Sequence, residues 1–145
     1  MDWKLELVVV PVADQDRAKA FYLDRFGFDL HVDHQGGPDF RVIQVTPPGS
    51  ACSVALMRNP ESAGTAQGLH LVVPDIVRAH SELVGRGARP GGLIHFVQGG
   101  QAEGPDPEGR DYNTFFEVHD PDGNGWLVQH VSGRVNEPQG VDRPR

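Results

Sequence analysis

Hydrophobic positions along the chain predict the same order of elements twice. Residues 5–12 (LELVVVPV) form a short and nearly continuous apolar run, which is typical of a strand buried on both faces. Asp14 then provides a helix N-cap, and Ala18, Tyr22 and Phe26 follow at the spacing of one helix face. Three further strands are predicted at residues 28–33, 40–46 and 51–57.

The second half of the chain repeats this order. Residues 69–73 predict a strand, Asp75 a helix N-cap, and Ile76 and Leu83 the apolar side of the helix that follows. Three more strands are predicted at residues 93–97, 114–119 and 126–131. Since Asp14 and Asp75 are 61 residues apart, the pattern predicts an α+β fold of two βαβββ modules, whose mixed sheets pair into a curved cup.

The length of 145 residues favours a single domain with room for a substantial core. We expect this domain at residues 1–133, with a first module at about residues 4–60 and a second at about residues 66–132. Residues 134–145 lack apolar periodicity and contain Pro138 and Pro144, so they are predicted to form a flexible C-terminal tail.

One connection is long for a segment between strands. Residues 99–111 (GGQAEGPDPEGRD) contain no predicted element, and such connections are usually functional or disordered. Arg110 and Tyr112 lie at its end, where they can fold over the mouth of a pocket. The alternative interpretation is a mobile surface loop.

Charge and cysteine content narrow the classes of partner. The formal net charge is −7 and no basic run is present, so a nucleic-acid partner is not expected. Cys52 is the single cysteine, which excludes an intramolecular disulfide and fits a reducing compartment. Because no signal-like or membrane-length apolar run is visible, we expect a cytoplasmic protein that does not bind membranes.

Three motifs together resemble one known family. Residues 115–131 (FFEVHDPDGNGWLVQHV) give a strand, a tight turn and a strand. The other two are strand-to-helix passages, PVADQDRAKAFYLDRFGF and GLHLVVPDIVRAHSELVGRGA, at residues 11–28 and 68–88. In this order they resemble the glyoxalase / bleomycin-resistance / extradiol-dioxygenase superfamily, the vicinal oxygen chelate proteins. The resemblance covers most of residues 5–131 and implies the paired βαβββ cup.

The resemblance also implies where a metal ion would be bound. Enzymes of this family take His, Gln and Glu ligands from the first and last strands of each module. The matching positions in this chain are occupied by Leu7, Ala55, Gly68 and Leu127. None of these residues can coordinate a cation, so we expect no metal and no other cofactor, and the family's glyoxalase and ring-cleaving chemistry is disfavoured. A two-residue shift keeps the strand face and brings in only His70 and Gln129.

Alternation along the strands selects residues that would face the cup. His70 shares a face with Gly68 and is a candidate general base or hydrogen-bond partner of a ligand; the alternative is a satisfied, partly buried histidine. Gln129 can donate and accept to an oxygenated ligand, or serve as a structural amide. Ser53 and Met57 share the face of the Ala55 position and would line the same space.

Further candidates complete the predicted ligand-binding set. Arg41 faces the cup if Ile43 and Val45 do, and would then pair with an anionic ligand; the alternative is a charge at the rim. His95 and Phe96 are candidates for stacking on a planar ligand. The full predicted set is Arg41, Ser53, Met57, His70, His95, Phe96, Arg110, Tyr112 and Gln129.

These residues favour a metal-independent protein that binds a small organic molecule, for example an aromatic one, in an apolar cup. We expect a homodimer, as is common in the family that the chain resembles. An alternative is a metal-free lyase, isomerase or cyclase that uses His70 as acid and base, so enzymatic activity stays open. A metal-dependent glyoxalase-like or dioxygenase-like enzyme and a pure interaction subunit are further alternatives.

Overall fold

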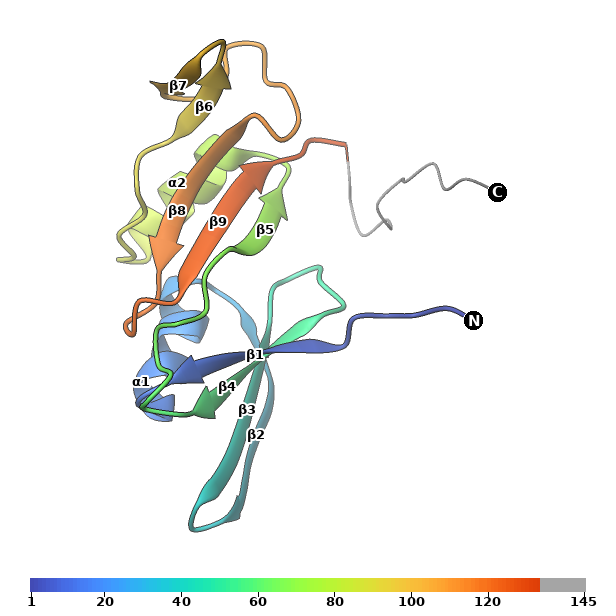
Figure 1. Cartoon of the computed structure of the whole chain (residues 1–145), viewed down its shortest axis with the longest axis vertical. Helices are drawn as coiled ribbons and strands as arrows, with labels where there is room; N and C mark the ends of the chain where they lie inside the picture. Colours follow the sequence, from blue (N-terminus) through green and yellow to red (C-terminus); the bar gives the residue numbers. More distant parts are fainter. Residues whose placement is uncertain (134–145) are drawn as a thin grey trace.

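The computed structural model describes residues 1–133, which form two mixed β-sheets with helices on one side of each (Figure 1). The predicted C-terminal tail at residues 134–145 lies outside the described residues. The first module comprises β1 (Leu7–Val12), α1 (Gln15–Ala20), the π-helical turn η1 (Phe21–Arg25), β2 (Asp29–Gly37), β3 (Phe40–Thr46) and β4 (Ser53–Arg58). The second comprises β5 (Leu69–Val73), α2 (Ile76–Gly85), β6 (Ile94–Val97), β7 (Gly100–Glu103), β8 (Thr114–His119) and β9 (Gly125–His130).

Each sheet is built around a parallel pair made of the first and last strands of its module. The first sheet has the order β1-β4-β3-β2, with β1 parallel to β4, and the second has the order β5-β9-β8-β6-β7, with β5 parallel to β9. All other neighbouring strands are antiparallel. The predicted α+β fold of two βαβββ-type modules is therefore confirmed, and neither sheet closes into a barrel.

Both predicted helix starts are confirmed. The Asp14 carboxylate accepts a hydrogen bond from the backbone N–H of Arg17 at 3.1 Å, and Asp75 accepts one from Arg78 at 3.1 Å. The side-chain oxygen satisfies a backbone donor that has no partner inside the helix. Equivalent caps 61 residues apart show that the duplicated pattern corresponds to a duplicated structure.

The expectation of one long connection at residues 99–111 is wrong for its first part. Gly100–Glu103 forms β7, an antiparallel partner of β6 that pairs Ile94 with Glu103 and Val97 with Gly100. Gly99 has a φ of 86°, and this left-handed conformation lets the chain reverse within two residues. The second module thus has one more strand than the first, and the remaining connection is shorter than predicted.

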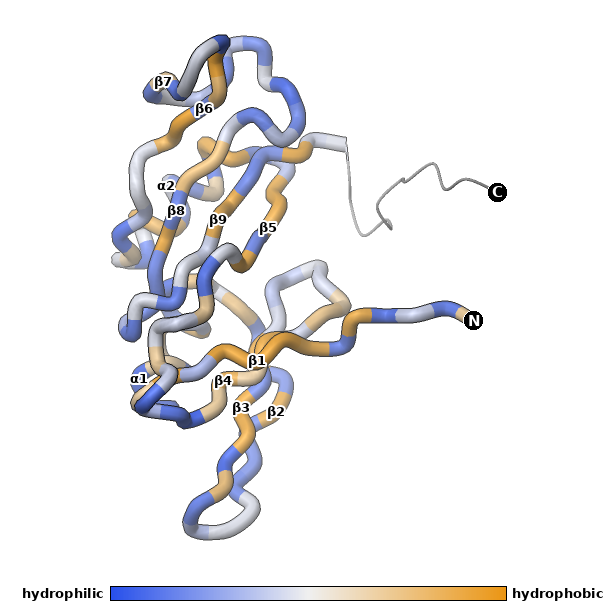
Figure 2. Tube along the Cα trace, in the orientation of Figure 1, coloured by the Kyte–Doolittle hydropathy of each residue, from blue (hydrophilic) through white to orange (hydrophobic). Residues whose placement is uncertain are grey.

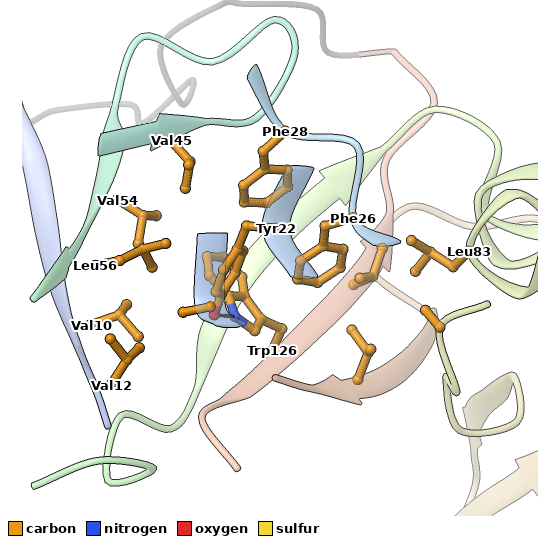
Figure 3. Packing of buried hydrophobic residues seen from close by; sticks show 14 of the residues in the cluster. Val10, Val12, Tyr22, Phe26, Phe28, Val45, Val54, Leu56, Leu83 and Trp126 are labelled. Carbon is orange, nitrogen blue, oxygen red and sulfur yellow. Dashed lines mark hydrogen bonds between the residues drawn. The ribbon is translucent and has the colours of Figure 1, made fainter. Parts of the chain in front are cut away.

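The core lies on the helix sides of the two sheets and is shared by both modules. Val10 and Leu56 from the first sheet and Phe116 from the second are fully buried in one continuous cluster. Tyr22 of η1 and Trp126 of β9 lie next to each other, with ring centroids 5.9 Å apart, between Leu56 and Leu83 in the view of Figure 3. Along the chain, hydrophobic residues concentrate in strands such as β1, whereas the turn between β2 and β3 is hydrophilic to neutral (Figure 2). Burial of this shared cluster holds the modules together.

A buried polar network joins the modules at the turn after β8. The Tyr22 hydroxyl donates to Asp120 Oδ2 at 2.9 Å and accepts from Trp126 Nε1 at 2.9 Å. Asn124 donates through Nδ2 to Asp120 Oδ2 at 2.8 Å and to the carbonyl oxygen of Pro11 at 2.9 Å. Burial, together with the neighbouring Asp120 carboxylate, raises the pKa of Tyr22 far above its usual range, so the hydroxyl stays protonated. The DPDGN turn therefore connects β1, η1 and β9.

Candidate functional site

Each sheet has one face against the helices and one face that we call the open face. In the second sheet, Phe116 and Val128 point toward the helix-side core. Strand alternation puts their neighbours on the opposite face, and α2 lies behind β8 and β9 in the view of Figure 1. The open face of the second sheet is formed by His70, Val72, Ile94, Phe96, Gln101, Glu103, Phe115, Glu117, His119, Leu127 and Gln129.

The strand register arranges the central side chains of this face in two rows. Leu127 is paired with His70 on one side and with Glu117 on the other. Gln129 is paired in the same way with Val72 and Phe115. Because neighbouring strands are roughly 4.8 Å apart, the Cα atoms of His70 and Glu117 lie about 10 Å from each other across Leu127.

His70 has a fixed tautomer. Its Nδ1 lies 2.6 Å from the carbonyl oxygen of Gly68, and since a carbonyl only accepts, Nδ1 carries the proton. The Nε2 atom is consequently an acceptor when the ring is neutral. His70 is exposed, and Nε2 makes no hydrogen bond to any residue within 1–133. The structure therefore leaves one ring nitrogen available for a ligand or a proton.

Glu117 and Gln129 also have free polar groups. The Glu117 side chain is exposed, and its carboxylate has no hydrogen bond or ion pair within the described part of the chain. The side-chain amide of half-buried Gln129 likewise has no partner among residues 1–133. Glu117 is not in the set predicted from the sequence. The DPDGN turn in the sequence was a signal for Glu117. The backbone N–H of Asp120 donates to the carbonyl of Asn124 in this turn, and the resulting strand register puts Glu117 opposite Leu127.

Two aromatic rings give the open face a flat apolar end. The rings of Phe96 and Phe115 lie 4.9 Å apart between centroids at an interplanar angle of 36°. Phe96 is 49% exposed, and Asn113 holds its backbone with two hydrogen bonds, one from the Phe96 N–H at 3.3 Å and one to its carbonyl at 3.2 Å. An exposed ring supported by a second ring is suited to stacking against a planar molecule.

His95 lies on the opposite side of β6 from Phe96. It is buried, and its Nδ1 lies 2.8 Å from the carbonyl oxygen of Gly104. Both residues nevertheless border a hollow of about 450 Å³ between β6 and residues 106–110, which Arg110 also lines. Three of the predicted residues are therefore brought together at this hollow.

The Arg110 guanidinium is engaged within its own loop. It donates to the buried Asp106 carboxylate, with Nε at 2.9 Å from Oδ2, and this hydrogen bond holds the pKa of Asp106 below its usual range. Asn113 donates to the same carboxylate at 3.0 Å. Tyr112, at a φ of 64°, is 48% exposed, and its backbone N–H bonds the carbonyl of His130 at 2.7 Å. Asp106 thus orders the loop that carries Arg110 and Tyr112.

The predicted residues of the first module divide between the two faces of its sheet. Ser53 and Met57 lie on the open face, where the Ser53 and Thr46 hydroxyls are 2.8 Å apart. Arg41 was expected to face the cup only if Ile43 and Val45 did. Ile43 and Val45 instead point into the helix-side core, and Arg41 lies on the same side of β3 as these two residues. Both faces of β3 are largely apolar, and packing against α1 decides which is buried.

The Arg41 side chain binds two carboxylates beside α1. It donates to Asp33 through Nε and Nη2, both at 2.9 Å, and to Asp16 through Nη1 at 2.7 Å. These bonds raise the pKa of Arg41 and, with Lys19, hold the pKa of Asp33 well below its usual range. Arg41 also lines a polar hollow of about 740 Å³ next to the start of α1, together with Met57.

The register also relates the positions considered for a metal ion. Val9 is paired with Ala55 in the first sheet, and His70 is paired with Leu127 in the second. These four positions therefore contain one histidine and three aliphatic side chains. Leu7 lies two residues before Val9 on the same face of β1. Gly68 lies two residues before His70, immediately before the start of β5. Among residues 1–133, no group of three or more His, Cys, Asp or Glu side chains is close enough to hold a metal ion.

Within one chain the two open faces do not cover each other. Val9 on the open face of β1 is 54% exposed, and Val72 on that of β5 is 42% exposed. The N-terminal arm before β1 extends away from the body of the molecule (Figure 1). It carries Trp3 and Leu5, which are 90% and 70% exposed. The predicted residues Ser53 and Met57 are therefore on a different surface from His70, Gln129 and Phe96.

Comparison with known proteins identifies the family. The sequence profile of the Glyoxalase/Bleomycin resistance protein/Dioxygenase superfamily matches residues 4–128. The chain belongs to this superfamily. The resemblance inferred from the three motifs is thus confirmed. The Bacillus subtilis (strain 168) protein YetH, described as uncharacterized, is 26% identical over 125 residues, which cover 84% of this chain and 93% of YetH.

Two solved structures of superfamily members are similar above 30% identity. TnmS3, an antibiotic binding protein from Streptomyces sp. CB03234, is 32% identical, with a TM-score of 0.67 and coverage of 90% of this chain and 98% of TnmS3. A glyoxalase/bleomycin resistance protein from the same strain is 31% identical, with a TM-score of 0.67 and coverage of 88% and 100%. Within residues 1–133, none of the helices is long and apolar enough to span a membrane.

Proposed function

We propose that this protein binds a small planar organic molecule, without a metal ion, on the open face of its second sheet. The observation that carries the proposal is the combination of the Phe96–Phe115 ring pair with unpartnered polar groups on His70 and Gln129. The similarity to TnmS3, an antibiotic binding protein, supports an organic ligand of this kind.

The chemistry of this face fits binding better than bond breaking. Apolar area on Leu127 and the two rings supplies affinity when a ligand removes it from water. His70 Nε2 and the Gln129 amide then orient the ligand, because each offers hydrogen bonds that nothing in residues 1–133 uses. A mostly apolar surface with a few directed polar groups is the usual composition of a ligand site.

We further propose that the working form is a homodimer in which a second copy covers the open faces. Val9, Trp3 and Leu5 expose apolar surface that a single chain leaves in water. Covering these residues would also exclude water from the ligand.

The single cysteine, whose thiol pKa is raised by burial, agrees with a cytoplasmic location.

A second candidate function is a metal-free lyase, isomerase or cyclase. The fixed tautomer of His70 favours it, since an Nδ1–H bonded to the Gly68 carbonyl leaves Nε2 ready to accept a proton. The two functions differ in the fate of the ligand. A binding protein returns it unchanged, whereas an enzyme converts it and loses turnover in His70→Ala while keeping its fold.

The test uses protein purified without an affinity tag and dialysed against a chelator. Binding of 1,4-dihydroxyanthraquinone, a neutral planar probe, is measured by equilibrium dialysis and by thermal melting, and the recovered probe is examined by mass spectrometry. We expect a rise in melting temperature with probe concentration and unchanged probe. The matched variants are Phe96→Ala on the open face and Val84→Ala on α2, which are 49% and 54% exposed in the native chain.

The outcomes separate the alternatives. Loss of binding in Phe96→Ala but not in Val84→Ala supports the open face as the site. Binding that requires added Zn²⁺, Ni²⁺, Fe²⁺ or Mn²⁺ contradicts the metal-independent proposal, and chemical conversion of the probe favours the enzyme. Equal binding in both variants moves the site away from Phe96.

A further inference from the structure

Glu117 is a charged group that neither the fold nor the proposed function yet explains. It lies on the open face of β8, in the same row as Leu127 and His70. Its carboxylate has no partner within residues 1–133. On the open face of β5, β9 and β8 it is the one carboxylate, and no Lys or Arg accompanies it there.

A carboxylate in this place needs a partner once the face is covered. Removing an ionised group from water without compensation costs several kcal/mol, so a covered Glu117 must receive hydrogen bonds or a positive charge. Its neighbour Leu127 offers neither, and His70 Nδ1–H is already used by Gly68. His119, two residues further along β8, is the other imidazole on this face. No side chain on the open face of these three strands carries a permanent positive charge, so a cation that compensates Glu117 must come from outside them.

In a second copy of the chain, the strands β1, β4 and β3 of the first sheet do not supply this charge, and β2 adds one histidine, His34, beside Val42. The open face of β1, β4 and β3 carries only uncharged side chains: Leu7, Val9, Pro11, Ser53, Ala55, Met57, Phe40, Val42, Gln44 and Thr46. The nearby cation Arg41 points to the other side and is already bound to Asp33 and Asp16. A copy that covered Glu117 with these three strands would therefore bury it against uncharged side chains.

We propose that Glu117 recognises a protonated nitrogen on the ligand, so that the site selects aromatic cations over neutral or anionic molecules of the same shape. This inference rests on the proposed function and specifies its ligand. Three groups on this face can receive hydrogen bonds: the Glu117 carboxylate, the His70 Nε2 atom and the side-chain oxygen of Gln129, whose NH2 group can also donate. A planar body on Leu127 and Phe115 would place a ring nitrogen or amine between Glu117 and His70, which are about 10 Å apart at their Cα atoms.

The test compares three probes with the same three-ring skeleton by isothermal titration calorimetry. They are 9-aminoacridine, a cation at neutral pH, 9-anthracenemethanol, which is neutral, and anthracene-9-carboxylate. The wild-type chain is expected to bind the cation at least about tenfold more tightly than the neutral probe, which is the range of a charge-assisted hydrogen bond, and the anion most weakly.

Variants assign this preference to one carboxylate. In Glu117→Gln, which keeps the side-chain shape, the preference for the cation is expected to fall to about twofold or less while affinity for the neutral probe is unchanged. The control Glu61→Gln removes an exposed carboxylate from the segment between β4 and β5 and should leave all three affinities as in the wild type. Thermal melting of each variant checks that the fold is retained.

Failure of this inference can be distinguished from failure of the proposed function. Equal binding of the cation and the neutral probe in wild type, or a preference that persists in Glu117→Gln, overturns the role of Glu117 while leaving the binding function intact. Absence of binding by every probe overturns both. Loss of the preference in Glu61→Gln as well would show general attraction to an acidic surface, and would also overturn the inference.

Discussion

The open faces of the two sheets occupy equivalent positions in the two modules but differ in chemistry. In the first sheet the parallel strands present Val9 against Ala55, and in the second they present His70 against Leu127. The open faces of β1, β4 and β3 are uncharged, whereas β5, β9 and β8 contribute two histidines, a carboxylate and an amide. A duplicated unit has thus kept its packing side and diverged on its open side.

The difference follows from what each face must satisfy. The helix sides of both sheets share one buried cluster, where nearly every substitution changes packing. The open sides are free of that constraint, so residues there can change without loss of the core. We therefore assign ligand binding to the second sheet in our proposal, and the covering of the ligand to the first sheet of a second copy.

The largest expected effect tests whether both sheets depend on one junction. In Asp120→Ala, the Tyr22 hydroxyl and the Asn124 amide lose a buried acceptor, and we expect the free energy of unfolding to fall by about 3 kcal/mol. Urea denaturation measures the loss, and Asp39→Ala in the exposed β2–β3 turn should stay within about 0.5 kcal/mol of wild type. Two separate unfolding transitions would show that the modules are less dependent on each other than the shared core implies.

The next effect tests the first open face as a cover. Val9→Asp is expected to weaken self-association roughly 100-fold, because the charge would be buried without a partner. Val84→Asp on α2 is a matched control, since both valines are 54% exposed, and it should leave association unchanged. Sedimentation equilibrium measures the difference. Equal effects of the two substitutions would remove the distinction between this face and ordinary surface.

A smaller effect compares polar groups on the two faces directly. Loss of the His70 hydrogen bond in His70→Ala should weaken 1,4-dihydroxyanthraquinone binding about tenfold, equivalent to roughly 1.4 kcal/mol. Gln44→Ala, on the first open face, should change affinity by about twofold or less. Equilibrium dialysis on both variants gives the answer, and a larger loss in Gln44→Ala would reverse the assignment of the two faces.

The smallest effect concerns the ion pairs that hold the edge of the first sheet to α1. Arg41 and Lys19 keep the pKa of Asp33 below its ordinary value of about 3.9, so its contribution is fully present above roughly pH 5 and is lost as the pH falls toward the folded-state pKa. Asp33→Asn should therefore lower the free energy of unfolding by about 1 kcal/mol at pH 7. The difference in the free energy of unfolding between Asp33→Asn and wild type should narrow between pH 5 and pH 2. The control Asp29→Asn should show no such difference. If this difference did not change with pH, the substitution would act through altered packing and not through the lost charge of Asp33.

Periodicity and caps were sufficient to predict the two modules. Asp14 and Asp75 begin helices as expected, and the first and last strands of each module pair in parallel. The face of β3 was not predictable in this way, because Val42 and Ile43 are both apolar and alternation alone does not say which is buried. Packing of α1 decides it, and Arg41 is turned toward Asp16 as a result.

The site was predicted in part. Alternation selected His70 and Gln129, which the structure brings to one surface with Phe96. Glu117 was missed because its importance depends on the pairing between strands, and a sequence pattern within one strand does not contain it. The strand β7 was missed for a similar reason, since Gly100–Glu103 has little strand propensity and is stabilised by its pairing with β6.

The two tryptophans provide the molecule with a pair of built-in optical reporters. Trp126 is 4% exposed beside Tyr22, and Trp3 is 90% exposed on the N-terminal arm. The indole of Trp126 should emit fluorescence at shorter wavelength than that of Trp3, because it is shielded from water. Unfolding then shifts the Trp126 emission to longer wavelength. Burial of the N-terminal arm would shift the Trp3 emission to shorter wavelength. One emission spectrum can therefore follow the core and the N-terminal arm separately.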